Sequence, residues 1–344
     1  MGTRSTGVSE VVPAVLPVRV RRLVRTHAKY RPVVIVGRNN GVGLTSDAQL
    51  LRAALEEEHA VHYFGTRGVP FMDMLTNRNH LRDAIVLYVE RVHALWMPFG
   101  HKSALIPNQE RYPRRQLWRL NFVDTVFCKS MQAQEVFSFY HRNSVYTGFT
   151  SRDNIDLSVQ PDYDAAFHLA GKSTFKGTQA LLNVWAKHPY WPLLTVVAHP
   201  NSEWNDRGAA NIRLIKSTLS REELLRLQNS CGLHICPSMA EGWGHYIVEG
   251  ASCRALVVTT DASPMNEHIT NERGCLIRAD YAGDRHLGRL YIPAERDIEN
   301  AMERVLDMDI ARRISLGLAA RAWYLKNNET CAERLRNAVL SLDD

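Results

Sequence analysis

LHICPSMAEGWGHYIVEG, residues 233–250, combines an apolar run, a turn that contains glycine and a helical pattern in direct succession. The apolar run predicts a buried strand, and Gly242 and Gly244 allow the backbone to turn sharply before the helix begins. Open α/β sheets bind ligands at the carboxyl ends of their strands, which is where this turn lies. The first amides of a helix have no partner inside it, so the turn is suited to an anion.

Two glutamates flank this turn. Glu241 precedes the predicted helix, and Glu249 lies about a turn and a half inside it. Because the two carboxylates lie at different depths, we do not expect them to form an acid/base pair across one bond. Carboxylates on both sides of an anion-binding turn suit a ligand with phosphates in its middle and hydroxyl-bearing sugars at both ends. That description fits a nucleotide sugar.

Strand and helix alternate along the rest of the chain. An apolar run, a glycine loop and a helix follow one another over 33–57, and the pattern starts again at 166 after a looser stretch, 147–163. The predicted strands are 33–36, 59–64, 84–89, 125–128, 166–170, 193–198, 211–215, 233–236 and 255–259. This alternation predicts an α/β protein with two doubly wound domains, 1–155 and 156–344, hinged near residue 155. We expect the last helix to pack back on the first domain.

Length and composition agree with two globular domains. The chain has 344 residues, 45% of them hydrophobic and 23% charged, which excludes a largely disordered chain. A membrane span needs about 20 consecutive apolar residues, and the runs here are much shorter. The first thirty residues have no apolar segment typical of a secretion signal. Six cysteines with apolar neighbours and no C-x-x-C pair predict reduced thiols, so we expect a cytoplasmic protein.

The charge balance leaves the nature of a partner open. The formal net charge is +6, and much of the excess lies in the first third of the chain. The basic residues concerned are Arg19, Arg21, Arg22, Arg25, Arg111, Arg114, Arg115 and Arg119. A solvated surface explains them, and so does a partner with negative charge, either anionic lipid or nucleic acid.

Two further loops contain residues suited to phosphate. Gly41-x-Gly43 precedes a helix, but Ser46 stands where a dinucleotide fingerprint requires its third glycine. Gly171-Lys172-Ser173 looks like the end of a Walker A loop, yet the first glycine of that motif is replaced by Ala166. What remains is a strand end that offers Lys172 and Lys176 beside a helix start, where two ammonium groups suit a diphosphate.

Several motifs, in order along the chain, resemble those of retaining GT-B glycosyltransferases of family four. The matching segments are the E-x7-E element from Glu241 to Glu249, the E-G-W-G at 241–244, Gly171-Lys172 with Lys176-Gly177, Leu214–Leu225 and the T-D-x5-E at Thr260–Glu267. The resemblance covers residues 165–280. It implies two Rossmann-like domains that face a cleft, an acceptor-side domain first and a nucleotide-sugar-binding domain second.

The resemblance also implies roles for individual residues. Lys172 and Lys176 would neutralise the donor diphosphate, together with the amides of Trp243, Gly244, His245 and Tyr246. Glu249 would bind the ribose, Glu241 the transferred sugar, and the backbone near Ile215 the base. Gly41 and Gly43 would lie under the donor phosphates from the opposite domain.

For the reaction, the resemblance implies transfer with retention of configuration, without a metal and without a cofactor other than the donor as co-substrate. The catalytic residues would be Glu241, Lys176 and a histidine of the first domain, for which His101 is preferred to His93. A UDP-sugar is the expected donor. The acceptor stays open between a glycan, a lipid, a small molecule and DNA, as does peripheral contact with an anionic membrane. Alternatives are a phage-type DNA glycosyltransferase, a non-catalytic nucleotide-sugar-binding protein and a nonhydrolysing epimerase.

Overall fold

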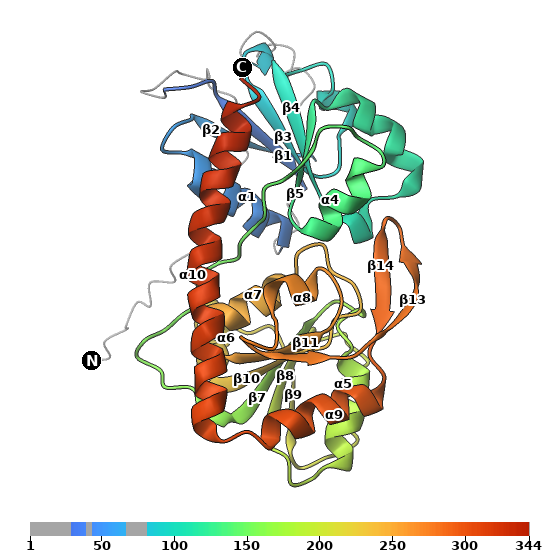
Figure 1. The fold of residues 1–344 in the computed structure, drawn as a ribbon, viewed down its shortest axis with the longest axis vertical. Coiled ribbons are helices and arrows are strands. Elements are labelled where there is room, and N and C mark those ends of the chain that lie inside the picture. The colour runs from blue at the N-terminus through green and yellow to red at the C-terminus, as the bar shows by residue number, and fades with distance from the viewer. Residues whose placement is uncertain (1–28, 39–42, 67–80, 344) are drawn as a thin grey trace, which may run out of the picture.

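The computed structural model describes residues 29–38, 43–66 and 81–343. Within them lie two six-stranded parallel sheets, stacked end to end along the long axis of the molecule (Figure 1). The strand orders are β2-β1-β3-β4-β5-β6 and β12-β11-β10-β7-β8-β9. The predicted α/β class with two doubly wound sheets is confirmed.

The first sheet and its helices lie within residues 33–146. In chain order the elements are β1 (Val33–Gly37), α1 (Gly43–Leu55), β2 (Val61–Gly65), β3 (Ile85–Glu90), η1 (Ala94–Trp96), β4 (Lys102–Pro107), η2 (Gln109–Arg111), η3 (Arg114–Phe122), β5 (Thr125–Cys128), α4 (Met131–Ser138) and β6 (Ser144–Tyr146). All five residues of β1 are buried, because β1 lies inside a parallel sheet that is covered on both faces.

The second sheet and its helices follow after residue 161. The elements are β7 (Asp162–Gly171), α5 (Thr178–Lys187), β8 (Leu193–Ala198), β9 (Ile212–Lys216), α6 (Arg221–Ser230), β10 (Cys231–Cys236), α7 (His245–Ser252), β11 (Leu256–Thr260), α8 (Met265–His268), β12 (Cys275–Ile277), β13 (Asp280–Arg285), β14 (Gly288–Ile292), α9 (Glu295–Leu306) and α10 (Ile310–Leu340). Ser220 and Glu223 form a capping box at the start of α6.

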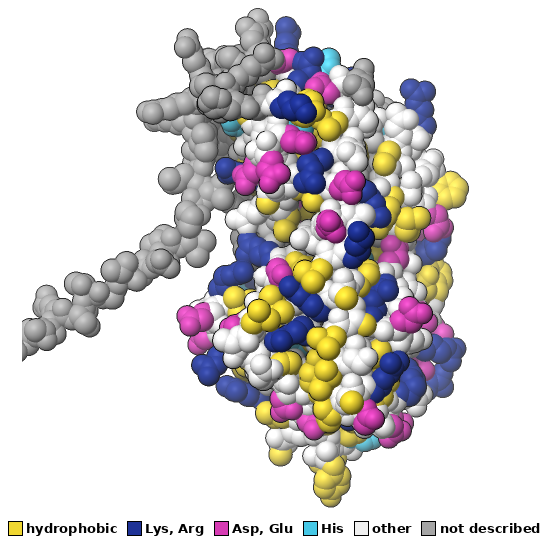
Figure 2. Space-filling model, turned by 60° about the vertical axis from the view of Figure 1, so that its left-hand side comes forward, with side chains coloured by type: hydrophobic (Ala, Val, Ile, Leu, Met, Phe, Trp, Pro, Cys, Tyr) yellow, Lys and Arg dark blue, Asp and Glu magenta, His cyan; other side chains and the backbone are white. Residues whose placement is uncertain are grey.

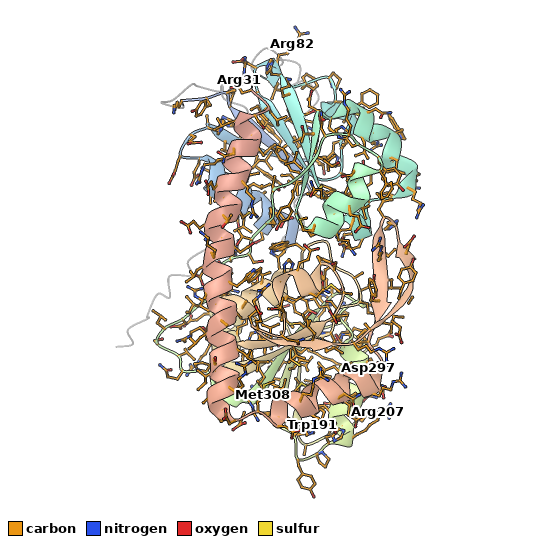
Figure 3. All side chains as sticks on the ribbon, viewed as in Figure 1. Arg31, Arg82, Trp191, Arg207, Asp297 and Met308 are labelled. Carbon is orange, nitrogen blue, oxygen red and sulfur yellow. The ribbon has the colours of Figure 1, made fainter. Side chains whose placement is uncertain are left out.

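The last helix, α10, spans both sheets (Figure 1). It begins near Met308 and ends near Arg31, residues that lie at opposite ends of the molecule (Figure 3). Arg31 forms an ion pair with Asp343, and the Arg336 side chain donates to the Ala54 carbonyl at 3.4 Å. The helix therefore packs back on the first domain, as expected, and holds the two sheets in one assembly.

The outer face of α10 differs from its packed face. Leu316, Ala320 and Tyr324 are buried, whereas Ile314 and Leu318 are exposed. Figure 2 shows apolar and basic side chains gathered on this side of the molecule. No helix in the described residues is long and apolar enough to cross a membrane. All six cysteines are buried, and none of them forms a disulfide in the structure.

A feature that the sequence did not predict is the antiparallel hairpin β13–β14, which extends from the second domain to the first (Figure 1). The Leu287 amide donates to the Gln109 carbonyl at 3.1 Å, and the Leu287 side chain is buried in the apolar core of the first domain. Ion pairs join Arg114 to Asp284 at 3.1 Å and Arg289 to Glu135 at 2.9 Å. The hairpin is thus a second bridge between the domains, opposite α10.

Candidate functional site

The candidate site is built around the start of α7, which follows β10 as predicted. Gly244 caps the helix with a φ of +91°, a left-handed conformation that favours glycine. Among the described residues, no acceptor lies within hydrogen-bond distance of the backbone amides of residues 243–246. Four free amides at the amino end of a helix, at the carboxyl edge of a parallel sheet, form an arrangement that binds anions.

Lys176 lies in the loop between β7 and α5 and reaches the start of α7 from there. Gly177, with a φ of +64°, caps α5 and lies so close to Pro237 that a Cβ there would be 2.4 Å from the Pro237 carbonyl oxygen. This close approach places Lys176 beside the loop that contains Glu241. The Lys176 Nζ donates to the Leu169 carbonyl at 2.6 Å and lies 3.9 Å from the centre of the Tyr246 ring. Burial lowers the pKa of Lys176, while Glu241 opposes the shift.

The two glutamates of the E-x7-E element both lie near enough to Lys176 to interact with its charge. The Ser238 hydroxyl donates to Glu241 Oε1 at 2.6 Å, and the Gln228 amide donates to Glu249 Oε2 at 3.5 Å. Burial raises the pKa of both carboxyls, and the positive charge of Lys176 acts against it. The structure therefore brings Glu241, Glu249 and Lys176 together, as the sequence predicted.

A buried polar network joins the first domain to the start of α7. His245 Nε2 lies 2.7 Å from Asp47 Oδ1, and Lys129 Nζ lies 2.7 Å from Asp47 Oδ2. Lys129 also donates to Asn108 Oδ1 at 3.0 Å, and His245 Nδ1 contacts the Ser151 hydroxyl at 2.9 Å. Burial alone would raise the pKa of Asp47, but the charge of Lys129 and the hydrogen bond with His245 outweigh it and lower the pKa to about 2. The network fixes α1 opposite α7.

Glu110 is a site residue that the sequence motifs did not single out; it lies in η2, directly after β4. Its carboxyl is buried, and Oε2 has no hydrogen-bond partner among the described residues. A Cβ on Gly242 would be 2.7 Å from that oxygen, so Glu110 lies against the loop that contains Glu241. Burial, followed by the negative charge of Glu241, raises the pKa of Glu110 from its ordinary 4.5 to about 7. The signal available in the sequence was its position at the carboxyl end of β4.

The remaining donor-site candidates lie in different surroundings. Lys172 is exposed and has no ion-pair partner among the described residues. The side chains of Trp243 and Tyr246 are buried, with the Trp243 Nε1 donating to the Ser151 hydroxyl at 3.2 Å. Ile215 lies on β9, the edge strand, with its side chain partly buried against an apolar cluster. A ligand at the start of α7 would therefore not contact the buried Trp243 and Tyr246 side chains, which agrees with the hypothesis that the amides bind it.

The structure does not bring His101 to this site. His101 precedes β4, and its amide donates to the carbonyl of Ala84, the residue before β3. It therefore lies at the amino end of a six-residue strand whose carboxyl end leads to Glu110, and such a strand spans about 20 Å. His93 follows β3 at the correct end of the sheet, so the preference for His101 is reversed. Burial, and then Arg38, lowers the pKa of His93 to about 4, which makes this imidazole neutral at pH 7.

Of the two glycines expected under the donor phosphates, the structure describes only Gly43. Gly43 is the first residue of α1, whose next turn contains Asp47, the partner of His245. Gly41 lies outside the described residues, as do Arg19, Arg21, Arg22 and Arg25. No group of three or more His, Cys, Asp or Glu side chains in the part of the chain that the structure describes could hold a metal ion.

Comparison with solved structures identifies the fold. The HepE protein (Alr3699) of Anabaena, solved in complex with UDP and glucose, is 14% identical with a TM-score of 0.67, over 91% of this chain and all of that one. Sucrose-phosphate synthase from Thermosynechococcus elongatus is 13% identical with a TM-score of 0.64, over 91% and 99%. A glycosyltransferase from Rickettsia africae is 14% identical with a TM-score of 0.63, over 92% and 99%. The fold is GT-B.

At these identities the comparisons establish the fold alone. No protein-family model matches the chain, and no curated protein matches it. In a GT-B fold, the site described above lies where the two domains meet. What the residues there do is a separate question.

Proposed function

We propose that this protein is a retaining glycosyltransferase of the family-four kind, which moves a sugar from a UDP-sugar to a hydroxyl acceptor without a metal. The observation that carries the proposal is the start of α7, where four free amides lie beside Lys176 and between Glu241 and Glu249. The transferred sugar, the phosphates and the ribose have matching partners in that order along one short segment. The GT-B fold and a neighbour solved with UDP and glucose support the choice of donor.

In the proposed complex, the diphosphate accepts hydrogen bonds from the α7 amides, and Lys176 neutralises its charge. Glu249 accepts from the ribose hydroxyls and Glu241 from hydroxyls of the transferred sugar. Lys176 can exchange its bond to the Leu169 carbonyl for one to a phosphate oxygen, since a charge-assisted bond to an anion is stronger than one to a neutral carbonyl. Gln109 supports the loop from the first domain, because its amide donates to the Glu241 carbonyl at 3.2 Å.

In the proposed reaction, the bond between the anomeric carbon and the diphosphate oxygen breaks first. The released oxygen accepts the proton of the acceptor hydroxyl, which attacks the sugar from the same face, so configuration is retained. Lys176 and the α7 amides stabilise the negative charge that develops on the diphosphate. The nearby carboxyls of Glu241 and Glu110 favour positive charge on the sugar ring. His245, fixed by Asp47, keeps the amide end of α7 aligned with the first domain.

The test is incubation of the protein with UDP-glucose, UDP-N-acetylglucosamine and GDP-mannose, each with a panel of hydroxyl acceptors. We expect release of UDP from one UDP-sugar, and proton NMR should show that the first product has the anomeric configuration of the donor. The control is Lys176→Ala, which should reduce the release severely. Binding of UDP without release from any donor would favour a non-catalytic binding protein. A product of inverted configuration would contradict the proposed mechanism.

A further inference from the structure

The tip of the β13–β14 hairpin brings basic residues of the second domain against the first. The Leu287 amide bonds to the Gln109 carbonyl, and Gly288 lies so close to Glu110 that a Cβ would be 2.8 Å from its Cα. Arg285 is the last residue of β13, two positions before Leu287. Its guanidinium carbon lies 3.5 Å from the centre of the Phe175 ring, and Phe175 precedes Lys176 in the chain. Arg285 therefore lies between the first domain and the proposed diphosphate site.

Three arginines of the first domain surround this tip. The Arg91 guanidinium donates to the Arg111 carbonyl at 3.1 Å, so β3 and η2 contribute neighbouring cations. Arg115, near the start of η3, is exposed. Burial lowers the pKa of His286, and the charges of Arg285, Arg91, Arg111 and Arg115 add to the shift. Four guanidinium groups from four segments are thus close enough to the hairpin tip to act on His286.

Carboxylates balance only part of this positive charge. Arg91 lies 3.3 Å from a Glu90 oxygen, and Arg111 lies 3.5 Å from an oxygen of Glu110. Glu110 is only partly ionised at neutral pH, since its pKa is about 7. Neither Arg115 nor Arg285 has a carboxylate partner among the described residues. Like charges held close together repel one another, and a bound anion removes that repulsion.

We propose that Arg91, Arg111, Arg115 and Arg285 form the acceptor subsite, and that the acceptor is a small molecule that carries a phosphate group. This inference rests on the proposed glycosyl transfer. Planar guanidinium groups bind phosphate oxygens in pairs, and a small cluster of them around one hairpin tip suits a single phosphate. A nucleic-acid strand or a membrane instead requires an extended basic track or face. The subsite adjoins Glu110, which contacts the Glu241 loop, so a phosphate there leaves the acceptor hydroxyl near the transferred sugar.

The experiment measures inorganic phosphate binding to the full-length protein by calorimetry, in a chloride buffer with saturating UDP. UDP fills the donor site, so that phosphate can report only on a second site. In Arg115→Ala/Arg285→Ala we expect phosphate affinity to fall at least about tenfold, since charge-assisted hydrogen bonds are lost. UDP affinity should stay unchanged. The matched control, Arg221→Ala/Arg226→Ala, removes two exposed charges from α6 and should bind phosphate like the unmutated protein.

Other anionic probes separate the sources of phosphate. A single-stranded 20-nucleotide DNA and vesicles of phosphatidylcholine and phosphatidylglycerol (3:1) are tested with the same variants. If DNA or vesicles bind through Arg115 and Arg285 while inorganic phosphate does not, the small-molecule assignment is overturned. Phosphate binding that the double variant leaves intact, or no binding of any probe, overturns the subsite. Failure of UDP itself to bind would instead contradict the proposed function, so the two failures are distinguishable.

Discussion

Replacement of Glu110 by Gln should stabilise the protein at neutral and alkaline pH. The carboxyl is buried, one of its oxygens has no partner among the described residues, and its pKa lies at about 7 against an ordinary 4.5. A group whose pKa is raised on folding favours the folded state below its unfolded pKa, and that stability is lost as the pH rises through the folded value. The loss therefore occurs between pH 4.5 and pH 7. At 1.36 kcal/mol per pKa unit it amounts to about 3 kcal/mol.

The assay is urea unfolding followed by tryptophan fluorescence at several pH values from 5 to 8. From pH 5 to pH 8, the free energy of unfolding of Glu110→Gln should rise by about 2 to 3 kcal/mol relative to that of the unmutated protein, because glutamine cannot ionise. Glu303→Gln, an exposed substitution on α9, is the matched control and should differ from the unmutated protein by less than about 0.5 kcal/mol at every pH. A difference between Glu110→Gln and the unmutated protein that is constant with pH would refute the assigned pKa and its cause.

Three further substitutions test the contacts around the site. Asp47→Asn should lower the free energy of unfolding by about 3 kcal/mol, because it leaves the buried Lys129 unpaired, and Asp47→Asn/Lys129→Met should recover part of that loss in the same urea assay. Glu249→Gln should raise the KM for the donor and leave kcat nearly unchanged, because a ribose contact is equal in ground and transition states; a fall in kcat alone would reject the ribose assignment. Leu287→Ser should increase the radius of gyration in X-ray scattering, because it removes the apolar contact of the hairpin with the first domain, and unchanged dimensions would show that α10 alone holds the domains.

The parts of the fold that could be predicted are those with local signals. Helix α5 (Thr178–Lys187) has such signals, because Gly177 precedes its start and Pro189 follows its end. The turn before α7 was also predictable, since Gly242 and Gly244 permit it. These same signals located Glu241, Glu249 and Lys176, which the structure places together.

The parts that could not be predicted depend on contacts between distant segments. The hairpin residues 280–292 lack a regular apolar alternation, so nothing local indicates strands; the contact of Leu287 with the first domain stabilises them. The pKa of Glu110 depends on Glu241, 131 positions later, and on burial that only the folded chain creates. His101 was a different error, because it precedes β4 and therefore lies at the amino end of the sheet. Open α/β sheets bind ligands at the carboxyl ends of their strands, and this principle favours His93 and Glu110 over His101.

The central claim is that the start of α7 and Lys176 bind a nucleoside diphosphate. Calorimetric titration of UDP into the unmutated protein, Lys176→Ala and Lys172→Ala tests it most directly. Lys176 lies against Tyr246 at the start of α7, whereas Lys172 is exposed, so the two variants remove the same charge from different positions. We predict that UDP binds the unmutated protein and that Lys176→Ala weakens binding at least about tenfold, with a smaller effect of Lys172→Ala. UDP that does not bind, or that binds Lys176→Ala as tightly as the unmutated protein, would contradict the account.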